Sequence, residues 1–307
     1  MAKKGLFVIN PHSGKCQIRN KLIDIIDIFV SSGIDVNIYT TQERKDAVKI
    51  IKQKGDKFDV VILSGGDGTL SESVKAVMTI PEYKRPVIGY IPAGTTNDFA
   101  TTLNIPKNMI KAAKNIAAGK VFKCDVGKFN SDYFIYIAAF GAFTDVSYGT
   151  PQQMKNYFGH FAYVMEGIKR VSSLSSYHIK MEYEGNAIEG DFIYGMIANT
   201  KSVAGIKNLI MEDVKLDDGL FEIVLIKMPQ TPFELQNILA GIVTNDLTND
   251  MFLCFRAPYV KITADNEMPW TLDGEYGGDD KDVYIENKKQ AIGILVDAKA
   301  AEKAAKK

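Results

Sequence analysis

The chain has 307 residues, enough for two domains of ordinary size. Hydrophobic residues make up 46% and charged residues 24%, which is typical of a globular protein and argues against disorder. Lysine plus arginine and aspartate plus glutamate both number 37, so the formal charge is zero and a basic nucleic-acid-binding protein is not expected.

The first 125 residues alternate short apolar runs with helical patterns. The apolar runs are typical of buried strands, and several helices end at a glycine. Strands are expected over 5–9, 35–40, 60–63 and 86–91, and helices over 18–29, 46–54, 70–78 and 108–118. This strand–helix alternation predicts an α/β domain with a doubly wound parallel sheet.

After about Asp125 the pattern changes to strands of period two, clearest over 177–184. We expect a β-rich antiparallel sandwich, interrupted by one helix over 152–170. That helix has a broad apolar face, for which packing on its own domain is favoured over contact with a membrane. We expect an α/β domain over 1–127 and a sandwich domain over 128–289. A C-terminal segment from about 290 to 307 is expected to pack back onto the first domain, and its end, over 298–307, to be frayed.

Cysteines and hydropathy indicate the compartment. Cys16, Cys124 and Cys254 show no CxxC spacing, which favours a reducing environment and no zinc site. No apolar segment approaches the ~18 residues that span a bilayer, and the start lacks a signal-peptide pattern. We therefore expect a cytoplasmic protein, which would reach a lipid substrate transiently at the inner face of the membrane.

A glycine-rich loop, Ser64–Thr69, follows a buried strand and opens a helix. Glycines let main-chain N–H groups approach an anion, and the helix N-terminus adds partial positive charge. A carboxylate beside bound phosphates needs a divalent cation between them, so Asp67 implies Mg²⁺. The loop matches neither the P-loop nor the dinucleotide fingerprint. The alternative is a tight turn in which Asp67 caps a helix.

Two further polar loops, over 10–15 and 91–99, also follow strands and precede helices. In a doubly wound sheet, the loops at the carboxyl ends of the strands share one edge, where ligands bind. Three glycine-bearing loops at that edge predict a nucleotide site and hence a kinase.

The motifs NPHSGK, SGGDGTL and PAGTTNDFA, joined later by LDDG and LDGE, resemble the diacylglycerol kinase catalytic family over nearly the whole chain. The resemblance is greatest to soluble bacterial members, with sphingosine and ceramide kinases as relatives. GGDGT is shared with NAD kinases and phosphofructokinases, whereas PAGTTNDFA discriminates this family from them. The resemblance implies an NAD kinase/diacylglycerol kinase-like fold with an ATP-binding first domain and a lipid-substrate second domain. It also implies transfer of the γ-phosphate of ATP to diacylglycerol, which gives phosphatidate.

The resemblance also implies roles for individual residues. Asp67, Asp98 and Asp125 would form an acidic network that fixes Mg²⁺, partly through water, and Glu275 would be the general base. By the residues alone, Asp98 indicates a helix cap, Asp125 a turn and Asp273-Gly274 a hairpin turn. The ATP-binding set that it implies consists of Asn10, Pro11, His12, Ser13, Gly14, Thr41, Gly65, Gly66, Asp67, Gly68, Thr69 and Thr95.

Some positions depart from the family or have a plainer interpretation. His12 replaces a small hydroxyl residue that members often have, and Ser71 replaces an asparagine. His160 and His178 are expected to be surface or packing residues. The turn 215–220 indicates an Asp-Gly turn by itself, and the resemblance implies a structural Mg²⁺ or Ca²⁺ there, held by the Asp218 carboxylate and the carbonyls of Lys215 and Leu220.

Alternative functions stay open. The acceptor could be sphingosine-like, monoacylglycerol or undecaprenol, and an NAD kinase is disfavoured by PAGTTNDFA. A non-catalytic lipid or nucleotide sensor is disfavoured because Asp67, Asp98 and Glu275 are intact. A lipid substrate and peripheral membrane contact are the expected partners, nucleic acid is not, and a homodimer is left open.

Overall fold

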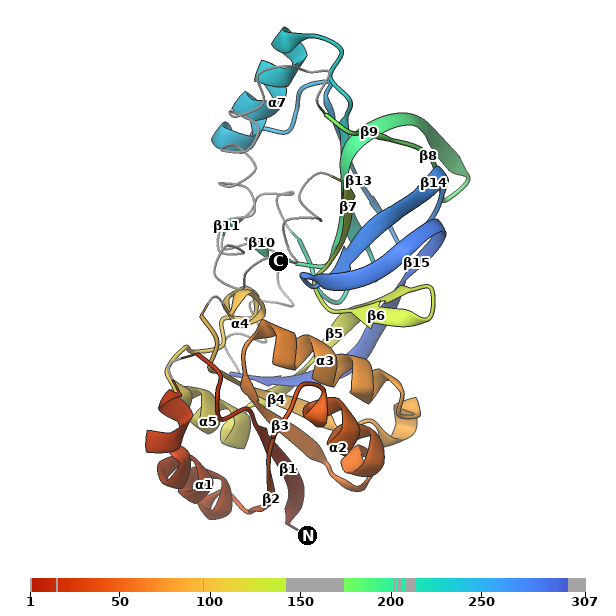
Figure 1. Cartoon of the computed structure of the whole chain (residues 1–307). Coiled ribbons are helices and arrows are strands. Elements are labelled where there is room, and N and C mark those ends of the chain that lie inside the picture. Colours follow the sequence, from red (N-terminus) through yellow and green to blue (C-terminus); the bar gives the residue numbers. More distant parts are fainter. Residues whose placement is uncertain are drawn as a thin grey trace. The chain divides into compact units, whose positions relative to one another are not determined.

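The computed structural model describes residues 2–14, 16–95, 97–141, 174–200, 202–203, 206–207 and 214–297 (Figure 1). The helix expected over 152–170, His160 and the tail 298–307 lie outside these residues. The chain divides into two compact units. The first unit comprises Met1–Val126, Lys215–Asp218 and Lys288–Lys307, and the second unit comprises Gly127–Val214 and Gly219–Asn287.

The first unit is built on parallel strands in the order β2-β1-β3-β4, and the end of β15 (Glu275–Val296) lies beside β4 through Ile294 and Ile88. All six residues of β3 are buried, as expected of a strand that is covered on both faces. The parallel strands are β1 (Lys3–Ile9), β2 (Ile34–Thr40), β3 (Val60–Gly65) and β4 (Val87–Pro92).

Helices cover both faces of this sheet. In Figure 1, α1 and α5 lie on one side of the strands, whereas α2 and α3 lie on the other. Their bounds are α1 (Leu22–Ser31), α2 (Asp46–Lys54), α3 (Asp67–Met78), α4 (Asp98–Thr102) and α5 (Met109–Ala118), with short 3₁₀ turns at Gln17–Asn20, Gly55–Lys57 and Glu82–Lys84. The predicted doubly wound α/β domain is confirmed.

The second unit is an antiparallel β structure, as predicted, in which β13-β12-β9-β7-β14-β15 are neighbours. β8 pairs with the remaining lengths of β9 and β14, and the short pair β10 (Ser202–Val203) and β11 (Ile206–Lys207) is separate. The other strands are β6 (Asp132–Phe134), β7 (Ile137–Gly141), β8 (Tyr177–Tyr183), β9 (Asn186–Ala198), β12 (Phe221–Lys227), β13 (Phe252–Ala257) and β14 (Tyr259–Leu272). Strand β5 (Lys120–Phe129) begins in the first unit and enters the second at Gly127.

Two hydrophobic clusters hold the second unit together. One is rich in aromatic side chains, and the Trp270 ring lies 5.0 Å from the rings of both Phe129 and Phe140. The other packs strand residues such as Met196 and Val224 against helix α7 (Pro232–Thr244). No helix in the described part of the chain is long and apolar enough to cross a bilayer.

Helix α7 corrects the sequence analysis, which expected one helix in this half and missed α7. The signal was present as a capping box. The Glu234 amide donates to the Thr231 hydroxyl at 3.2 Å, and the Glu234 carboxylate accepts from the Thr231 amide at 3.3 Å. Pro232, at the first helical position, favours a helix start in the same way.

Candidate active site

Three loops of the first unit meet beyond the carboxyl ends of β1, β3 and β4. The Asn10 amide donates to the Ser64 carbonyl at 2.9 Å, and the Ala93 amide donates to the Gly65 carbonyl at 2.8 Å. A Cβ atom on Gly66 would lie 3.3 Å from Gly94 Cα and 3.8 Å from Ser13 Oγ. The structure therefore brings the three polar loops into contact with one another.

The walls of this loop cluster are main chain. Gly14 has a φ of +55°, and a Cβ atom there would lie 2.1 Å from the Ala93 carbonyl oxygen. A Cβ atom on Gly94 would lie 2.6 Å from Gly66 Cα. Only glycine fits at either position, so the loops approach one another without side chains between them. A cradle of bare main chain is suited to an anion such as phosphate.

Asp67 is the first residue of α3, but its carboxylate binds the start of α4. It accepts from the amides of Asp98 at 3.2 Å and Phe99 at 3.4 Å. Asp67 therefore does not cap the helix that its own turn opens, which corrects that alternative, and its carboxylate instead binds the first amides of α4. Burial raises the pKa of Asp67, and the amides of Asp98 and Phe99 oppose that rise. The chain thus keeps a poorly hydrated carboxylate beside the phosphate-type cradle.

Tyr90 and Asn97 lie behind the cradle. The sequence pointed to Asn97 only as part of the motif PAGTTNDFA and gave no sign of Tyr90. The Asn97 side chain accepts from the Gly94 amide at 3.0 Å and donates to the Gly94 carbonyl at 2.9 Å. The Tyr90 hydroxyl lies 3.2 Å from the Gly65 carbonyl and 3.3 Å from Asn97 Oδ1. Burial raises the pKa of Tyr90 well above its ordinary value, and Asp67 and Asp98 add to this. Tyr90 therefore stays protonated and links two loops as a donor.

Thr41 directly follows β2, the strand next to β1. Its amide and its hydroxyl both lie within hydrogen-bond distance of the Ile9 carbonyl, at 2.9 and 3.4 Å. While its hydroxyl donates to that carbonyl, Thr41 offers a ligand its oxygen lone pairs. That suits a ligand hydroxyl or amino group better than a phosphate oxygen.

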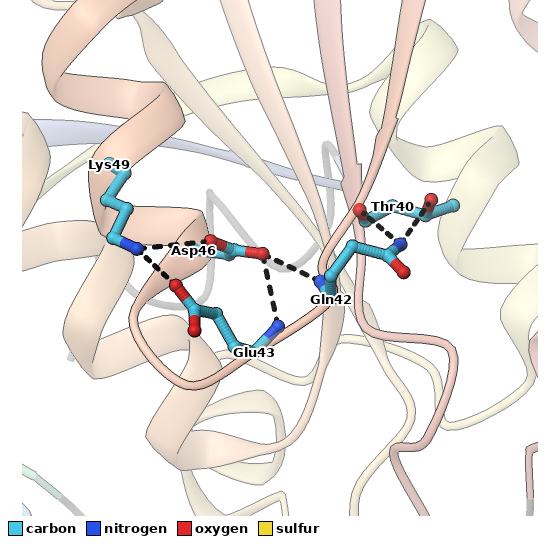
Figure 2. Close-up of polar contacts among 5 residues, drawn as sticks. All are labelled: Thr40, Gln42, Glu43, Asp46 and Lys49. Atoms are coloured by element: carbon cyan, nitrogen blue, oxygen red, sulfur yellow. Dashed lines mark hydrogen bonds and ion pairs between the residues drawn. The ribbon is translucent and has the colours of Figure 1, made fainter.

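Asp46 holds the loop that follows Thr41 (Figure 2). Its carboxylate accepts from the amides of Gln42 at 2.7 Å and Glu43 at 3.1 Å. Lys49 lies 3.7 Å from the other Asp46 oxygen and also pairs with Glu43. The amide of Gln42 is the main cause that lowers the pKa of Asp46. Asp46 is 7% exposed, so a buried carboxylate holds the main chain of this loop.

Asp125 is completely buried, and its described contacts lie elsewhere in the first unit. Its amide donates to the Leu216 carbonyl at 2.8 Å, and its carboxylate accepts from the Gln290 amide at 2.6 Å. The Gln290 side chain donates to the Asp217 carbonyl at 3.2 Å. Asp67 and Asp98 thus lie near Tyr90, whereas Asp125 lies near the 215–218 turn.

The metal predictions can be compared with this geometry. Across the part of the chain that the structure describes, no three His, Cys, Asp or Glu side chains form a group that could hold a metal ion. For the expected structural cation, Lys215 and Asp218 belong to the first unit and Leu220 to the second. The Leu220 carbonyl accepts from the Asn287 side chain at 3.2 Å. Both metal sites stay predictions.

Glu275 belongs to the second unit and opens β15 directly after the turn Asp273-Gly274. Leu272 pairs with Glu275, so the turn is a two-residue hairpin loop, as the Asp-Gly pattern indicated. Asp273 and Gly274 have φ values of +53° and +83°. Glu275 itself is exposed.

The remaining predicted residues lie in the same loops of the first unit. The His12 amide donates to Asn10 Oδ1 at 3.0 Å, which shapes the turn that contains Pro11. Gly68 and Thr69 are in the first turn of α3, Thr95 precedes α4, and Lys15 lies outside the described residues. In the second unit, His178 lies 3.0 Å from Asp191, in agreement with a surface role.

Comparison with known proteins is consistent along the chain. The diacylglycerol kinase catalytic domain matches residues 4–129, and the YegS C-terminal NAD kinase beta sandwich-like domain matches residues 143–295. A diacylglycerol kinase of Staphylococcus carnosus (strain TM300) is 34% identical over 280 residues, 91% of this chain and 90% of the relative. One from Staphylococcus aureus (strain MRSA252) is also 34% identical and covers 91% and 88%.

Solved structures agree with these matches. A putative diacylglycerol kinase from Bacillus anthracis superposes with a TM-score of 0.83 at 27% identity, covering 97% of each chain. An NAD kinase from Archaeoglobus fulgidus, solved in complex with ATP, has a TM-score of 0.56 at 12% identity and covers 98% and 96%. The second likeness shows a shared fold only.

Proposed function

We propose that this chain, which belongs to the diacylglycerol kinase family and is a lipid kinase, transfers the γ-phosphate of ATP to the hydroxyl of diacylglycerol to form phosphatidate. The observation that carries the proposal is the main-chain cradle around Gly14, Gly66 and Gly94. It supports binding of a polyphosphate at the carboxyl edge of the parallel sheet. The kinship with proteins named diacylglycerol kinase supports the choice of acceptor.

In this proposal the three loops bind ATP. The segments 10–14 and 65–69, together with Thr95, contact the phosphates, and Thr41 contacts the nucleoside through its oxygen lone pairs. The side chains of Asn97 and Tyr90 keep two of these loops in place. Loops that are fixed before ATP arrives do not have to be ordered by binding.

The donor set fits Mg²⁺. Asp67 and Asp98 offer carboxylate oxygens, the ligands that this cation prefers. Burial disfavours the charged form of Asp67, and a bound cation would offset that cost. When bound, Mg²⁺ would neutralise negative charge on the phosphates. Asp67 would hold it, directly or through water, while its bonds to the amides of Asp98 and Phe99 fix the carboxylate in place. The family resemblance also assigns Asp125 to this network, although its carboxylate binds the Gln290 amide near the 215–218 turn.

Glu275 is the proposed general base. Phosphoryl transfer needs little covalent assistance from the protein, so positioning and charge supply most of the catalysis. Glu275 would orient the lipid hydroxyl and accept its proton as the hydroxyl oxygen attacks the γ-phosphorus. The ester bond to phosphorus forms as the bond between the γ-phosphorus and the bridging oxygen breaks, and ADP leaves.

The acceptor is tested with radiolabelled ATP against a panel of lipids in mixed micelles, with NAD included. We expect label in phosphatidate from diacylglycerol, with less from sphingosine, monoacylglycerol and undecaprenol. Label mainly in another lipid would replace the acceptor but keep the lipid kinase. Label in NADP would contradict the proposal.

Two variants test the residue roles. Asp67→Ala should abolish transfer while circular dichroism shows an intact fold, and retained activity would remove Asp67 from the mechanism. Glu275→Gln should bind ATP normally and lose turnover, because its carboxamide cannot accept the proton. Unchanged turnover of Glu275→Gln would reject the general-base role.

The structural cation and the membrane contact are further parts of the proposal. Asp218→Ala should lower the melting temperature, and added Mg²⁺ or Ca²⁺ should no longer raise it. An unchanged melting temperature would argue against a cation there. Because diacylglycerol resides in bilayers, the protein must contact a membrane surface during turnover, and sedimentation with substrate-bearing vesicles measures that contact.

A further inference from the structure

We infer that Asp273 is a positioning residue for the catalytic base: it fixes the hairpin turn that sets where Glu275 stands. The inference rests on the proposed function, in which Glu275 accepts the proton of the lipid hydroxyl. All of its evidence lies within the second unit.

Glu275 is not held by its own side chain. The residue is exposed, and with the described residues its carboxylate makes no hydrogen bond or salt bridge. Its position therefore comes from the main chain, through the pairing of Leu272 with Glu275 across the turn. The strand register shifts between Trp270 and Thr271, so the pairing farther along the hairpin does not fix the tip by itself. The contacts that hold the turn Asp273-Gly274 in place therefore also hold Glu275 in place.

The turn has a demanding conformation. Asp273 and Gly274 both have positive φ, +53° and +83°, which is the pattern of the two-residue loops that match the twist of β-hairpins. Gly274 adopts this conformation without a steric penalty, and aspartate tolerates it better than most residues. Local preference therefore permits the turn, but it does not orient the turn on the rest of the unit.

The Asp273 side chain supplies that orientation. It is only 4% exposed, and its carboxylate accepts from three consecutive amides, those of Ile135 at 2.9 Å, Tyr136 at 3.0 Å and Ile137 at 3.1 Å. The Asp273 amide donates to the Ile137 carbonyl at 2.8 Å, and the Tyr136 hydroxyl donates to the Asp273 carbonyl at 2.8 Å. The turn is thus fastened to the start of β7 through side chain and main chain together.

The carboxylate cannot be replaced by its amide without loss. One oxygen of Asp273 accepts from Ile135, and the other accepts from Tyr136 and Ile137. In asparagine one of these oxygens becomes an NH₂ group, which would point a donor at an amide donor. Charge also strengthens hydrogen bonds of this kind. Asp273 is therefore a buried anchor of the turn, and the exposed Glu275 follows it two residues later.

The decisive experiment is a double-mutant cycle with Asp273→Asn and Glu275→Gln, assayed for kinase activity on diacylglycerol in mixed micelles. Asp273→Asn should lower kcat by about 10- to 100-fold, as expected when a catalytic group is displaced, with the KM for ATP unchanged. If Asp273 acts through Glu275, the double variant is no slower than Glu275→Gln alone. Multiplied losses in the double variant, or a full kcat for Asp273→Asn, would overturn the inference.

A matched control distinguishes the positioning of Glu275 by Asp273 from a general loss of stability in the second unit. Asn130 also binds the main chain of β15, since its side chain accepts from the Tyr284 amide at 2.9 Å, but far from the turn. Asn130 has a φ of +48°, so Asn130→Gly removes the side chain without main-chain strain. We expect Asn130→Gly to lower the melting temperature and to keep kcat. An equal loss of kcat in Asn130→Gly would make Asp273 merely structural.

Tyr136→Phe serves as a milder variant should Asp273→Asn fail to fold. It removes one hydrogen bond to the turn, and its cycle with Glu275→Gln must show the same lack of additivity. The results also distinguish the two levels of the proposal. If Glu275→Gln is inactive and the double variant shows the product of the two single losses of kcat, only the role of Asp273 is rejected. If Glu275→Gln is fully active, the general base is rejected and this inference with it.

Discussion

Single side chains in both units shape functional loops by binding their main-chain amides. Asp67 accepts from two amides at the start of α4, Asp46 from two in the loop after β2, and Asp273 from three at the start of β7 and just before it. Each carboxylate replaces the partners that such amides would find in water. The loops are therefore ordered before a ligand arrives, which lowers the entropy lost on binding.

Asp46 gives a pH-dependent prediction. Its folded pKa lies below the ordinary value of 3.8, chiefly because of the Gln42 amide. A depressed pKa contributes stability that is present above 3.8 and is lost as the pH falls through the folded value. Asp46→Asn should therefore melt at a lower temperature than the wild type at about pH 7, and the difference should shrink towards about pH 3.

Differential scanning fluorimetry across that pH range makes the measurement. Glu43→Gln is the control, because it removes the exposed pairing with Lys49 and leaves both amide bonds of Asp46 in place. We expect the control to melt close to the wild type, since exposed ion pairs contribute little. A melting difference for Asp46→Asn that stays constant with pH would contradict the assignment.

At the scale of elements, the start of α7 can be tested. Thr231→Ala removes the hydroxyl that accepts from the Glu234 amide, and the loss of such a cap costs about 0.5 to 2 kcal/mol. Urea denaturation followed by circular dichroism measures this difference. Thr244→Ala is the control, because the Thr244 hydroxyl donates to the Ala240 carbonyl at the opposite end of α7 and accepts from no amide of the first turn. Equal stability of the two variants would contradict a capping role for Thr231.

The elements also show how far sequence reasoning reaches. Helix α2 has the predicted bounds, since glycine follows its last residue, and α3 begins at Asp67 rather than Leu70 because Gly66 precedes its first turn. Helix α7 was missed although Leu235, Ile238 and Ile242 recur at helical spacing and a capping box marks its start. Periodicity fixes long patterns well, whereas short apolar runs remain ambiguous.

In the candidate site, too, some features could be predicted from the sequence and others could not. The three loops could be predicted because the carboxyl ends of parallel strands share an edge. The positioning role of Asp273 could not, because its partner Ile135 is 138 residues away in sequence. Tyr90 stands in an apolar strand, where nothing local indicates that its hydroxyl reaches Gly65 and Asn97. Side chains that bind main chain far away in the sequence produce no local pattern from which their role could be predicted.

At the scale of the whole molecule, the first unit is completed by the far end of the chain. Residues Lys288–Lys307 are grouped with Met1–Val126, and Ile294 pairs with Ile88 of β4. The Arg85 guanidinium donates to the Ala291 carbonyl at 3.1 Å and to the Ile80 carbonyl at 2.9 Å. The sheet that carries the three polar loops thus includes a strand that follows the second unit in the sequence.

This dependence predicts the effect of shortening the chain. Ending it after Asn287 removes Ile292, Ile294 and Val296, which are at most 2% exposed. Each such side chain contributes about 1.5 to 3 kcal/mol by burial, a large part of the ~5 to 15 kcal/mol that stabilises a domain. We expect ATP binding to be lost, with fast hydrogen exchange in β1, β3 and β4, because the sheet that carries the loops loses its neighbour at β4.

Ending the chain after Asp297 is the matched control, since it keeps every described residue of β15 and should bind ATP as the full chain does. Ile294→Ala gives a graded version, with an expected loss of about 2 to 5 kcal/mol in stability and an unchanged pattern of exchange in β8 and β9 of the second unit. Full ATP affinity in the chain that ends at Asn287 would show that the parallel sheet is stable without its last strand. The end of β15 would then not be needed for ATP binding by the first unit.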